Sequence, residues 1–373
     1  MEFFDHAWPF SEKNDGVFTQ KTAAERNRIR ILGLLARRIC KSQRQIALTT
    51  GLQASTVSNI VRELKNSNII REGQAIEADR VGPKETELEI VDHFIWTVGV
   101  SLDPQSYRIM LVNALGHVLA QQRLAPGISL DQLPAELAKA IPECAKRADL
   151  ALSKLGGVGI SVPGAVNNET GEILVSRSLG ASRVPLKDNL QNALNCPVWV
   201  ERNVACGAYA ESQIGAAPGR DSFIYFLLRS EPNQPEIFGL SLVVGEKIFH
   251  GCNSAAGEVD QNILASCITH LDENGRPKPG SLDAFYESYA RGLAGIINLL
   301  DVGCLILCSN DDNLTQGRFD VINNVLQNSL ITVPDRRFQL IRSDIGIAGM
   351  LHGAALLALH RSLATHITPK KSG

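Results

Sequence analysis

The sequence lacks the features of membrane-spanning, secreted and disulfide-stabilised proteins. No apolar run in its 373 residues reaches the roughly 18 residues that a bilayer-spanning helix needs. The opening stretch, MEFFDHAWPFSEKNDG, has no basic segment followed by an apolar one, so it does not resemble a signal peptide. The eight cysteines are scattered, mostly in apolar surroundings, as free thiols in a reducing compartment are. These absences predict a cytoplasmic globular protein with no membrane partner.

Charge is distributed unevenly along the chain, although its formal net value is only −2. Residues 21–84 contain 13 lysines and arginines against 5 acidic residues, a net charge of +8, and the remainder carries −10. A basic segment on an acidic body favours a protein whose front end meets a polyanion. A solvated basic face that binds nothing is the alternative interpretation of the charge alone.

The basic segment predicts three consecutive helices, at residues 22–38, 42–49 and about 54–66. A glycine-containing turn, TGLQAST, separates the second helix from the third. Four apolar residues of the third helix fall at i, i+3, i+4 and i+7 and predict one buried stripe: Val57, Ile60, Val61 and Leu64. The opposite face is polar, with side chains of the kinds that reach phosphates or base edges in a major groove.

The segment after the third helix, NIIREGQAIEADRVGPKETELEIV, indicates two strands joined by a turn at Gly82-Pro83. Three helices followed by such a wing are typical of a winged helix-turn-helix, and the partner expected is a double-stranded DNA operator. Eleven residues are predicted to contact DNA: Ser42, Gln43, Gln53, Ser55, Thr56, Ser58, Asn59, Arg62, Lys65, Arg80 and Lys84.

From Phe94 onward the pattern changes to strands alternating with helices. Two similar rounds of three strands, a helix, a strand and a helix follow one another, which predicts an α/β fold with two lobes and a cleft. Four motifs follow one another along this part of the chain: GVGISVPGAV, VERNVACGAYAE, GCNSAAGEVDQ and ARGLAGIINLLDVGCLIL. In order and spacing they resemble the ROK family of repressors, open reading frames and sugar kinases, over roughly Thr22 to Ala364.

The resemblance implies an N-terminal winged helix-turn-helix followed by a two-lobed actin/hexokinase-like, ribonuclease H-like domain. The expected division is a flexible arm at 1–20, a DNA-binding domain at 21–91 and the ROK-like domain at 92–373. Lobe one is expected at about 92–218 with the C-terminal helix 345–366, and lobe two at about 219–344.

The sequence departs from the kinases of this family at the position of the catalytic base. Those kinases carry Asn and then Asp after the strand that ends in Val-Glu, and the Asp deprotonates the sugar hydroxyl. Here the two positions are Arg202 and Asn203. An amide does not accept a proton near neutral pH, so no catalytic residue is predicted and the chain is expected not to be an enzyme.

The motifs for phosphate and for zinc depart from the family as well. The first phosphate loop reads VSLDPQSYR, where Pro104 removes a backbone amide, and the second carries Glu231 and Glu236, which repel phosphate. Gln261 replaces the family's zinc-site histidine, and only Cys267 and His270 follow. No metal and no cofactor are therefore predicted, and the loss of the zinc motif also weakens the case for sugar binding.

Four polar residues are the candidate ligand-binding set: Arg202, Asn203, Glu258 and Gln261. The resemblance implies that Glu258, in AAGEV, bonds sugar hydroxyls, and Asn203 can hydrogen-bond one too. Arg202 fits a sugar acid or sugar phosphate, or equally a surface ion pair.

Three functions remain open from the sequence. The first is a transcriptional regulator, expected to be a repressor of carbohydrate-related genes, with a sugar or sugar derivative as effector. The second is an active sugar kinase with an added domain. In the third, the body only oligomerises or docks proteins. A homodimer or homotetramer is expected on a pseudo-palindromic operator, and the small-residue helices could pack between protomers or within one.

Overall fold

The computed structural model describes residues 20–366 except for a set of short segments: residues 37, 77–84, 231–236, 259–268, 279 and 332–335. The described part forms two compact units. One contains the described residues up to Ser161, with 185–200 and the chain from Ala354, and the other contains 162–184 and 201–353. The domain limits predicted above remain predictions, and the arm at 1–20 lies almost wholly outside the described residues.

Within the described residues, no helix combines the length and the apolar character that crossing a membrane requires.

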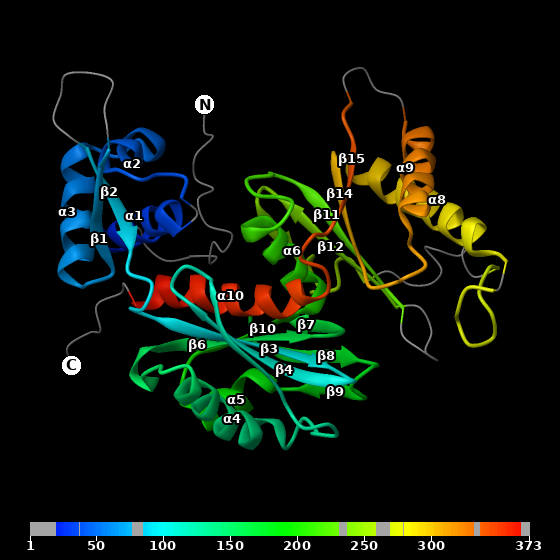
Figure 1. Cartoon of the computed structure of the whole chain (residues 1–373), viewed down its shortest axis with the longest axis horizontal. Coiled ribbons are helices and arrows are strands. Elements are labelled where there is room, and N and C mark those ends of the chain that lie inside the picture. Colours follow the sequence, from blue (N-terminus) through cyan, green and yellow to red (C-terminus); the bar gives the residue numbers. More distant parts are fainter. Residues whose placement is uncertain are drawn as a thin grey trace. The chain divides into compact units, whose positions relative to one another are not determined.

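The N-terminal part consists of three helices and a two-stranded antiparallel sheet (Figure 1). Its elements are α1 (Gln20–Ala36), α2 (Gln43–Thr50), α3 (Ala54–Asn66), β1 (Ile70–Ile76) and β2 (Glu85–Ile90). Gly51 ends α2 in the left-handed region at φ 70°, and its N–H bonds the Ala47 carbonyl at 2.9 Å. The predicted apolar stripe of α3 is confirmed as buried, with each residue at most 5% exposed.

A five-stranded sheet follows, in the order β10-β6-β3-β4-β5. Its strands are β3 (Trp96–Asp103), β4 (Ser106–Asn113), β5 (Val118–Arg123), β6 (Leu155–Val162) and β10 (Val198–Arg202). Strands β3, β4 and β5 form an antiparallel meander, and β6 joins β3 in parallel. Between them the chain forms α4 (Leu133–Arg147), the 3₁₀ turn Leu152–Lys154, a small sheet and α5 (Leu186–Leu194). The small sheet comprises β7 (Ala165–Asn167), β8 (Glu172–Ser176) and β9 (Ala181–Val184).

The last helix, α10 (Ala348–His366), packs closely on this sheet (Figure 1). A Cβ on Gly159 of β6 would lie 2.0 Å from the Ala354 carbonyl oxygen, so only glycine allows this approach. Thr97 of β3 also donates a hydrogen bond to the Ala355 carbonyl, at 3.0 Å. The face of α10 that carries these two carbonyls therefore packs within one chain.

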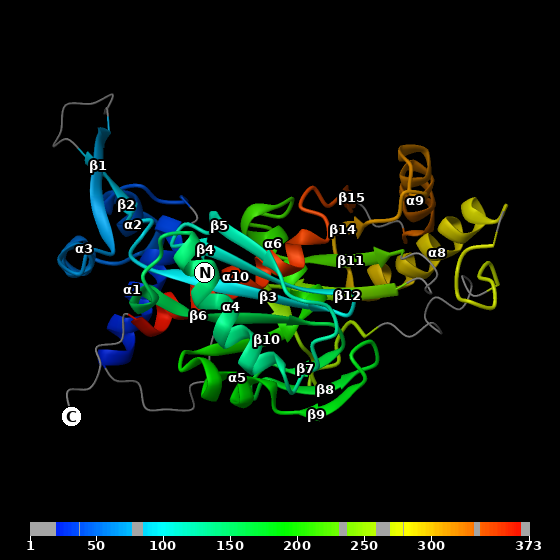
Figure 2. The same ribbon diagram turned by 60° about the horizontal axis from the view of Figure 1, so that its bottom comes forward.

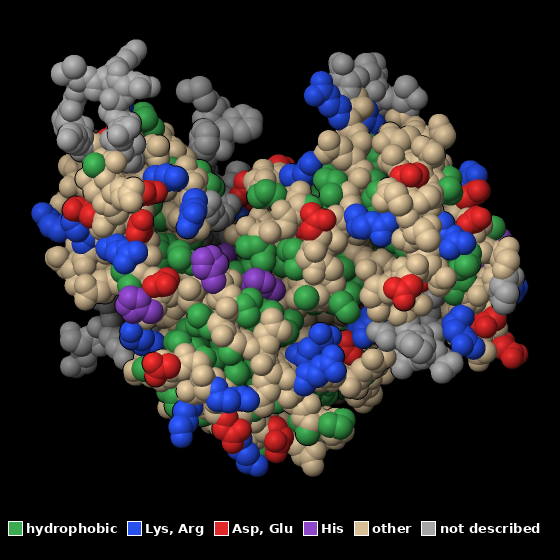
Figure 3. Space-filling model, in the orientation of Figure 1, with side chains coloured by type: hydrophobic (Ala, Val, Ile, Leu, Met, Phe, Trp, Pro, Cys, Tyr) green, Lys and Arg blue, Asp and Glu red, His purple; other side chains and the backbone are tan. Residues whose placement is uncertain are grey.

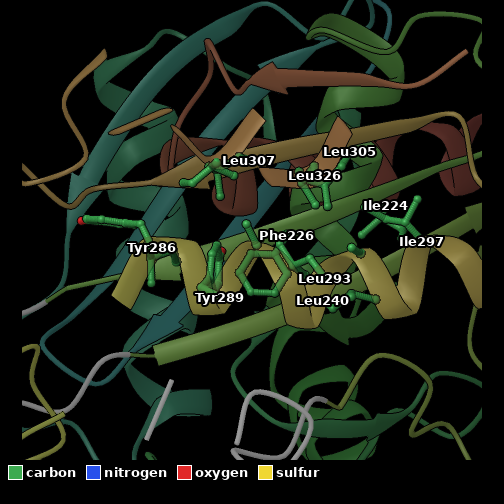
Figure 4. Close-up of a cluster of buried hydrophobic side chains, with 14 of the residues drawn as sticks. Ile224, Phe226, Leu240, Tyr286, Tyr289, Leu293, Ile297, Leu305, Leu307 and Leu326 are labelled. Atoms are coloured by element: carbon green, nitrogen blue, oxygen red, sulfur yellow. The ribbon is translucent and has the colours of Figure 1, made fainter. Parts of the chain in front are cut away.

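The second sheet has the order β13-β12-β11-β14-β15, and Figure 2 labels its strands β11, β12, β14 and β15. Its strands are β11 (Phe223–Arg229), β12 (Ile237–Val244), β13 (Lys247–Phe249), β14 (Cys304–Ser309) and β15 (Gln339–Arg342). Helix α6 (Asn203–Ile214) covers one face with an apolar cluster that includes Val204 and Tyr225. Helices α8 (Leu282–Leu300) and α9 (Gln316–Ser329) pack against strands of this sheet through a second apolar cluster. In that cluster the rings of Phe226 and Tyr289 meet edge to face (Figure 4).

The two five-stranded sheets have the same internal order. In each, three antiparallel strands come first, and the next strand along the chain pairs in parallel with the first of them. This repetition confirms the predicted α/β class and its two rounds of βββαβα.

Candidate functional sites

Helix α3 presents a polar, solvent-exposed face opposite its buried stripe. Of the predicted DNA contacts on α3 and at its start, five are exposed: Gln53, Ser55, Ser58, Asn59 and Arg62. Thr56 and Lys65 are half-buried, and Lys65 is paired with Glu72 of β1. Arg62 donates a hydrogen bond from Nη2 to Asn59 Oδ1 at 2.9 Å, which holds two long side chains in one arrangement. Figure 3 shows Lys and Arg side chains spread over the visible surface of the winged helix.

The predicted DNA contacts at α2 and on the wing differ in exposure. Gln43 is exposed, whereas Ser42 is 1% exposed and caps α2 by accepting the Gln45 N–H at 3.3 Å. The Ser42 hydroxyl also donates to Glu85 of β2 at 2.6 Å. Its side chain is thus committed to joining α2 to the wing and is poorly placed to reach DNA. Arg80 and Lys84 lie outside the described residues.

A second polar site lies where β10 ends and α6 begins. Glu201, the penultimate residue of β10, is 1% exposed, and its Oε2 accepts a hydrogen bond from His250 Nε2 at 2.7 Å. Its Oε1 accepts the Arg202 backbone N–H at 2.8 Å. Burial raises the pKa of Glu201, but His250 and Arg202 together lower it more, so the pKa lies below its ordinary value. Glu201 is therefore a charged, fully bonded carboxylate inside the fold.

Arg202 is buried, contrary to the expectation that an ion pair here would lie at the surface. Its side chain is 1% exposed, and its Nη1 lies 3.3 Å from Glu258 Oε1. The Glu258 side chain is 48% exposed, so this ion pair joins a buried cation to an open carboxylate. The structure brings together two of the four predicted ligand residues, and Gln261 lies outside its described part.

Asn203 begins α6 directly after Arg202. Its Oδ1 accepts the Val204 N–H at 2.8 Å, so the carbonyl side of the amide is bonded within the first turn of the helix. The side chain is half-buried and has no acidic group. The residue at the position expected for the catalytic base is therefore an amide bonded to the first turn of α6.

The first loop predicted to have lost phosphate binding is a tight turn between β3 and β4. Asp103 pairs with Ser106 across the turn, and the Asp103 Oδ1 accepts the Gln105 N–H at 3.0 Å. Phosphate loops bind phosphate through backbone N–H groups, and here one such group already donates its hydrogen bond to a carboxylate. Glu231, Glu236 and Cys267 lie outside the described residues, so the second loop and the zinc motif stay untested.

Sequence reasoning missed the pair of Glu201 and His250. The two residues stand 49 positions apart, and no local pattern links them. A charged residue at the end of a buried strand was the one available signal, because such residues are rarely buried without a partner.

Within the described residues, three helices and a two-stranded sheet precede two five-stranded sheets that share one topology. Residues 97–266 match the model of the ROK family. The xylose repressor of Caldicellulosiruptor bescii is 26% identical over 229 residues, which are 60% of this chain and 55% of the relative. The chain thus matches little more than half the length of its curated relatives.

Solved structures show the same fold. A ROK family transcriptional regulator, a homologue of the E. coli MLC protein, superposes with a TM-score of 0.72 at 17% identity, over 93% of this chain and 99% of that one. A ROK glucokinase from Streptomyces griseus, in complex with glucose and AMPPNP, gives a TM-score of 0.56 at 18% identity, over 70% of this chain and 98% of that one. The family thus includes both repressors and sugar kinases.

Proposed function

We propose that the chain is a DNA-binding transcriptional regulator, a repressor of carbohydrate-related genes, whose ROK domain binds a small effector and catalyses no reaction. The observation that carries this proposal is the exposed polar face of α3 on a basic winged helix. The fold likeness to a ROK regulator extends over 93% of the chain, whereas the likeness to the glucokinase extends over 70%.

The mechanism follows from linkage between two binding events. Two copies of the chain present two α3 helices to the half-sites of an operator, in the cytoplasm. An effector lowers operator affinity only if it binds the non-binding arrangement more tightly. Asn203 and Glu258 supply polar groups for its hydroxyls, and the effector class is a sugar or sugar derivative.

Substituting the exposed face of α3 is expected to weaken specific DNA binding. Duplexes selected by the full chain from a random pool provide the probe, and fluorescence anisotropy at fixed salt provides the affinity. Arg62→Ala and Asn59→Ala should each raise Kd about 5- to 100-fold, the range of one lost base contact. The matched control is Arg291→Ala on α8, whose side chain is 64% exposed, and it should bind like the wild type. Unchanged affinity in both α3 variants would remove α3 as the recognition helix.

The chain is also expected not to transfer phosphate from ATP to sugars. Asn203 offers no proton acceptor, and the Asp103 carboxylate holds the Gln105 amide of the first loop. Purified chain with ATP and a panel of hexoses should show no sugar phosphorylation above buffer, and Asn203→Asp should not create any. Turnover that disappears in Asn203→Ala would contradict this part of the proposal.

A further inference from the structure

Arg202 carries an unused pair of hydrogen-bond donors inside the protein. Of its three guanidinium nitrogens, Nη1 is paired with Glu258. Nε and Nη2 are buried and have no hydrogen-bond partner among the described residues. A buried cation of this kind is unfavourable unless its donors are satisfied, and an apolar side chain of similar size would avoid the penalty.

The two unused nitrogens lie on one edge of the guanidinium. Nε–H and one Nη2–H point the same way and form a rigid fork, which matches two oxygens on one carbon or phosphorus atom. A hydroxyl of a neutral sugar can occupy only one of the two donors well. The fork therefore favours a carboxylate or a phosphate.

Among the described residues, no neighbouring group forms a hydrogen bond with this fork. The two oxygens of Glu201 accept hydrogen bonds from His250 and from the Arg202 backbone N–H, and neither accepts one from the fork. Arg202 is also the N-cap residue of the 12-residue helix α6, where the helix dipole favours negative charge. Asn203 is next to it and is half-buried, a neutral group suited to a hydroxyl.

We propose that the free edge of Arg202 binds the carboxylate or phosphate of an acidic sugar, so that the effector is an anion. This inference rests on the proposed effector role of the ROK domain and narrows its ligand class. Glu258 orients the guanidinium through Nη1 and, being half exposed, connects it to solvent.

Thermal shift and calorimetric titration of the full chain test the inference with four probes: D-glucuronate, D-glucose 6-phosphate, D-glucose and inorganic phosphate. One of the two acidic sugars should bind at least ten-fold more tightly than D-glucose, and which one does separates a carboxylate from a phosphate ligand. Arg202→Met should weaken that binding at least ten-fold. Glu287→Gln on α8, at an exposed ion pair outside this site, is the control and should retain it. Preference for D-glucose, or no binding of either acidic sugar, overturns the inference.

A second readout separates a ligand role from a structural one. Arg202→Met removes a charge with two unpaired donors, but it also removes a cation that lowers the pKa of the buried Glu201, so the unliganded variant is first shown to be folded by circular dichroism. Equal weakening of D-glucose and acidic-sugar binding in the folded variant would make Arg202 a structural residue and would overturn the inference. DNA affinity is measured separately with the α3 variants. Failure of the acidic-sugar inference therefore leaves the test of the regulator proposal unchanged.

Discussion

Gly353→Ala is expected to destabilise the fold at or above the upper end of the roughly 1–3 kcal/mol that overpacking a core usually costs. A Cβ on Gly353 of α10 would lie 1.8 Å from the carbonyl oxygen of Cys206 and 2.6 Å from its carbonyl carbon. Both are backbone atoms of α6, so no side-chain rotation relieves the overlap and one helix has to shift. Urea denaturation of the full chain measures the change.

The matched control is Gly295→Ala on α8, where an added Cβ meets nothing within 4 Å. This variant should instead gain about 0.8–1 kcal/mol, the difference in helix propensity between glycine and alanine. Equal denaturation midpoints for Gly353→Ala and the wild type would contradict the close packing of α10 on α6.

Glu201→Ala is the second substitution with a large expected effect, a loss of about 3 kcal/mol in the free energy of unfolding. It leaves His250 without its partner at 2.7 Å and the Arg202 N–H without its acceptor at 2.8 Å, both inside the fold. Glu287→Ala is the control, because this side chain is 47% exposed and its contact with Arg291 is 3.9 Å long. An exposed pair of this kind contributes at most about 1 kcal/mol.

The loss in Glu201→Ala should depend on pH in a defined direction. The pKa of Glu201 in the folded protein lies below its ordinary value of 4.5, so the carboxylate stabilises the fold fully above that value. The contribution disappears as pH falls through the lowered pKa. Denaturation series from neutral to acidic pH should therefore show wild type and variant converging below about pH 4.5. A constant gap across that range would show that Glu201 acts through packing and not through charge.

The fold could be predicted from the sequence because its signals are periodic. The stripe on α3 repeats every three or four residues, and the second round of strands and helices repeats the first. The glycine turn at Gly51 was visible for the same local reason.

The sites could be predicted only in part, because their contacts join distant residues. Arg202 was a candidate, but its burial was not foreseen, since arginine is usually exposed and its partner Glu258 stands 56 positions away. Ser42 shows a second reason, because one local pattern fits two different roles. A serine before a helix fits both a DNA contact and a helix cap, and only the contact with Glu85 on the wing separates them.

The ratio of two dissociation constants tests the regulator proposal most directly. The full chain is titrated, at about 0.15 M salt, onto a duplex that it selected from a random pool and onto a random duplex of equal length. A sequence-specific regulator should bind the selected duplex about 1,000-fold or more tightly. A ratio near one would mean that the basic winged helix only attracts polyanions, and it would contradict the proposal that the chain is a sequence-specific regulator.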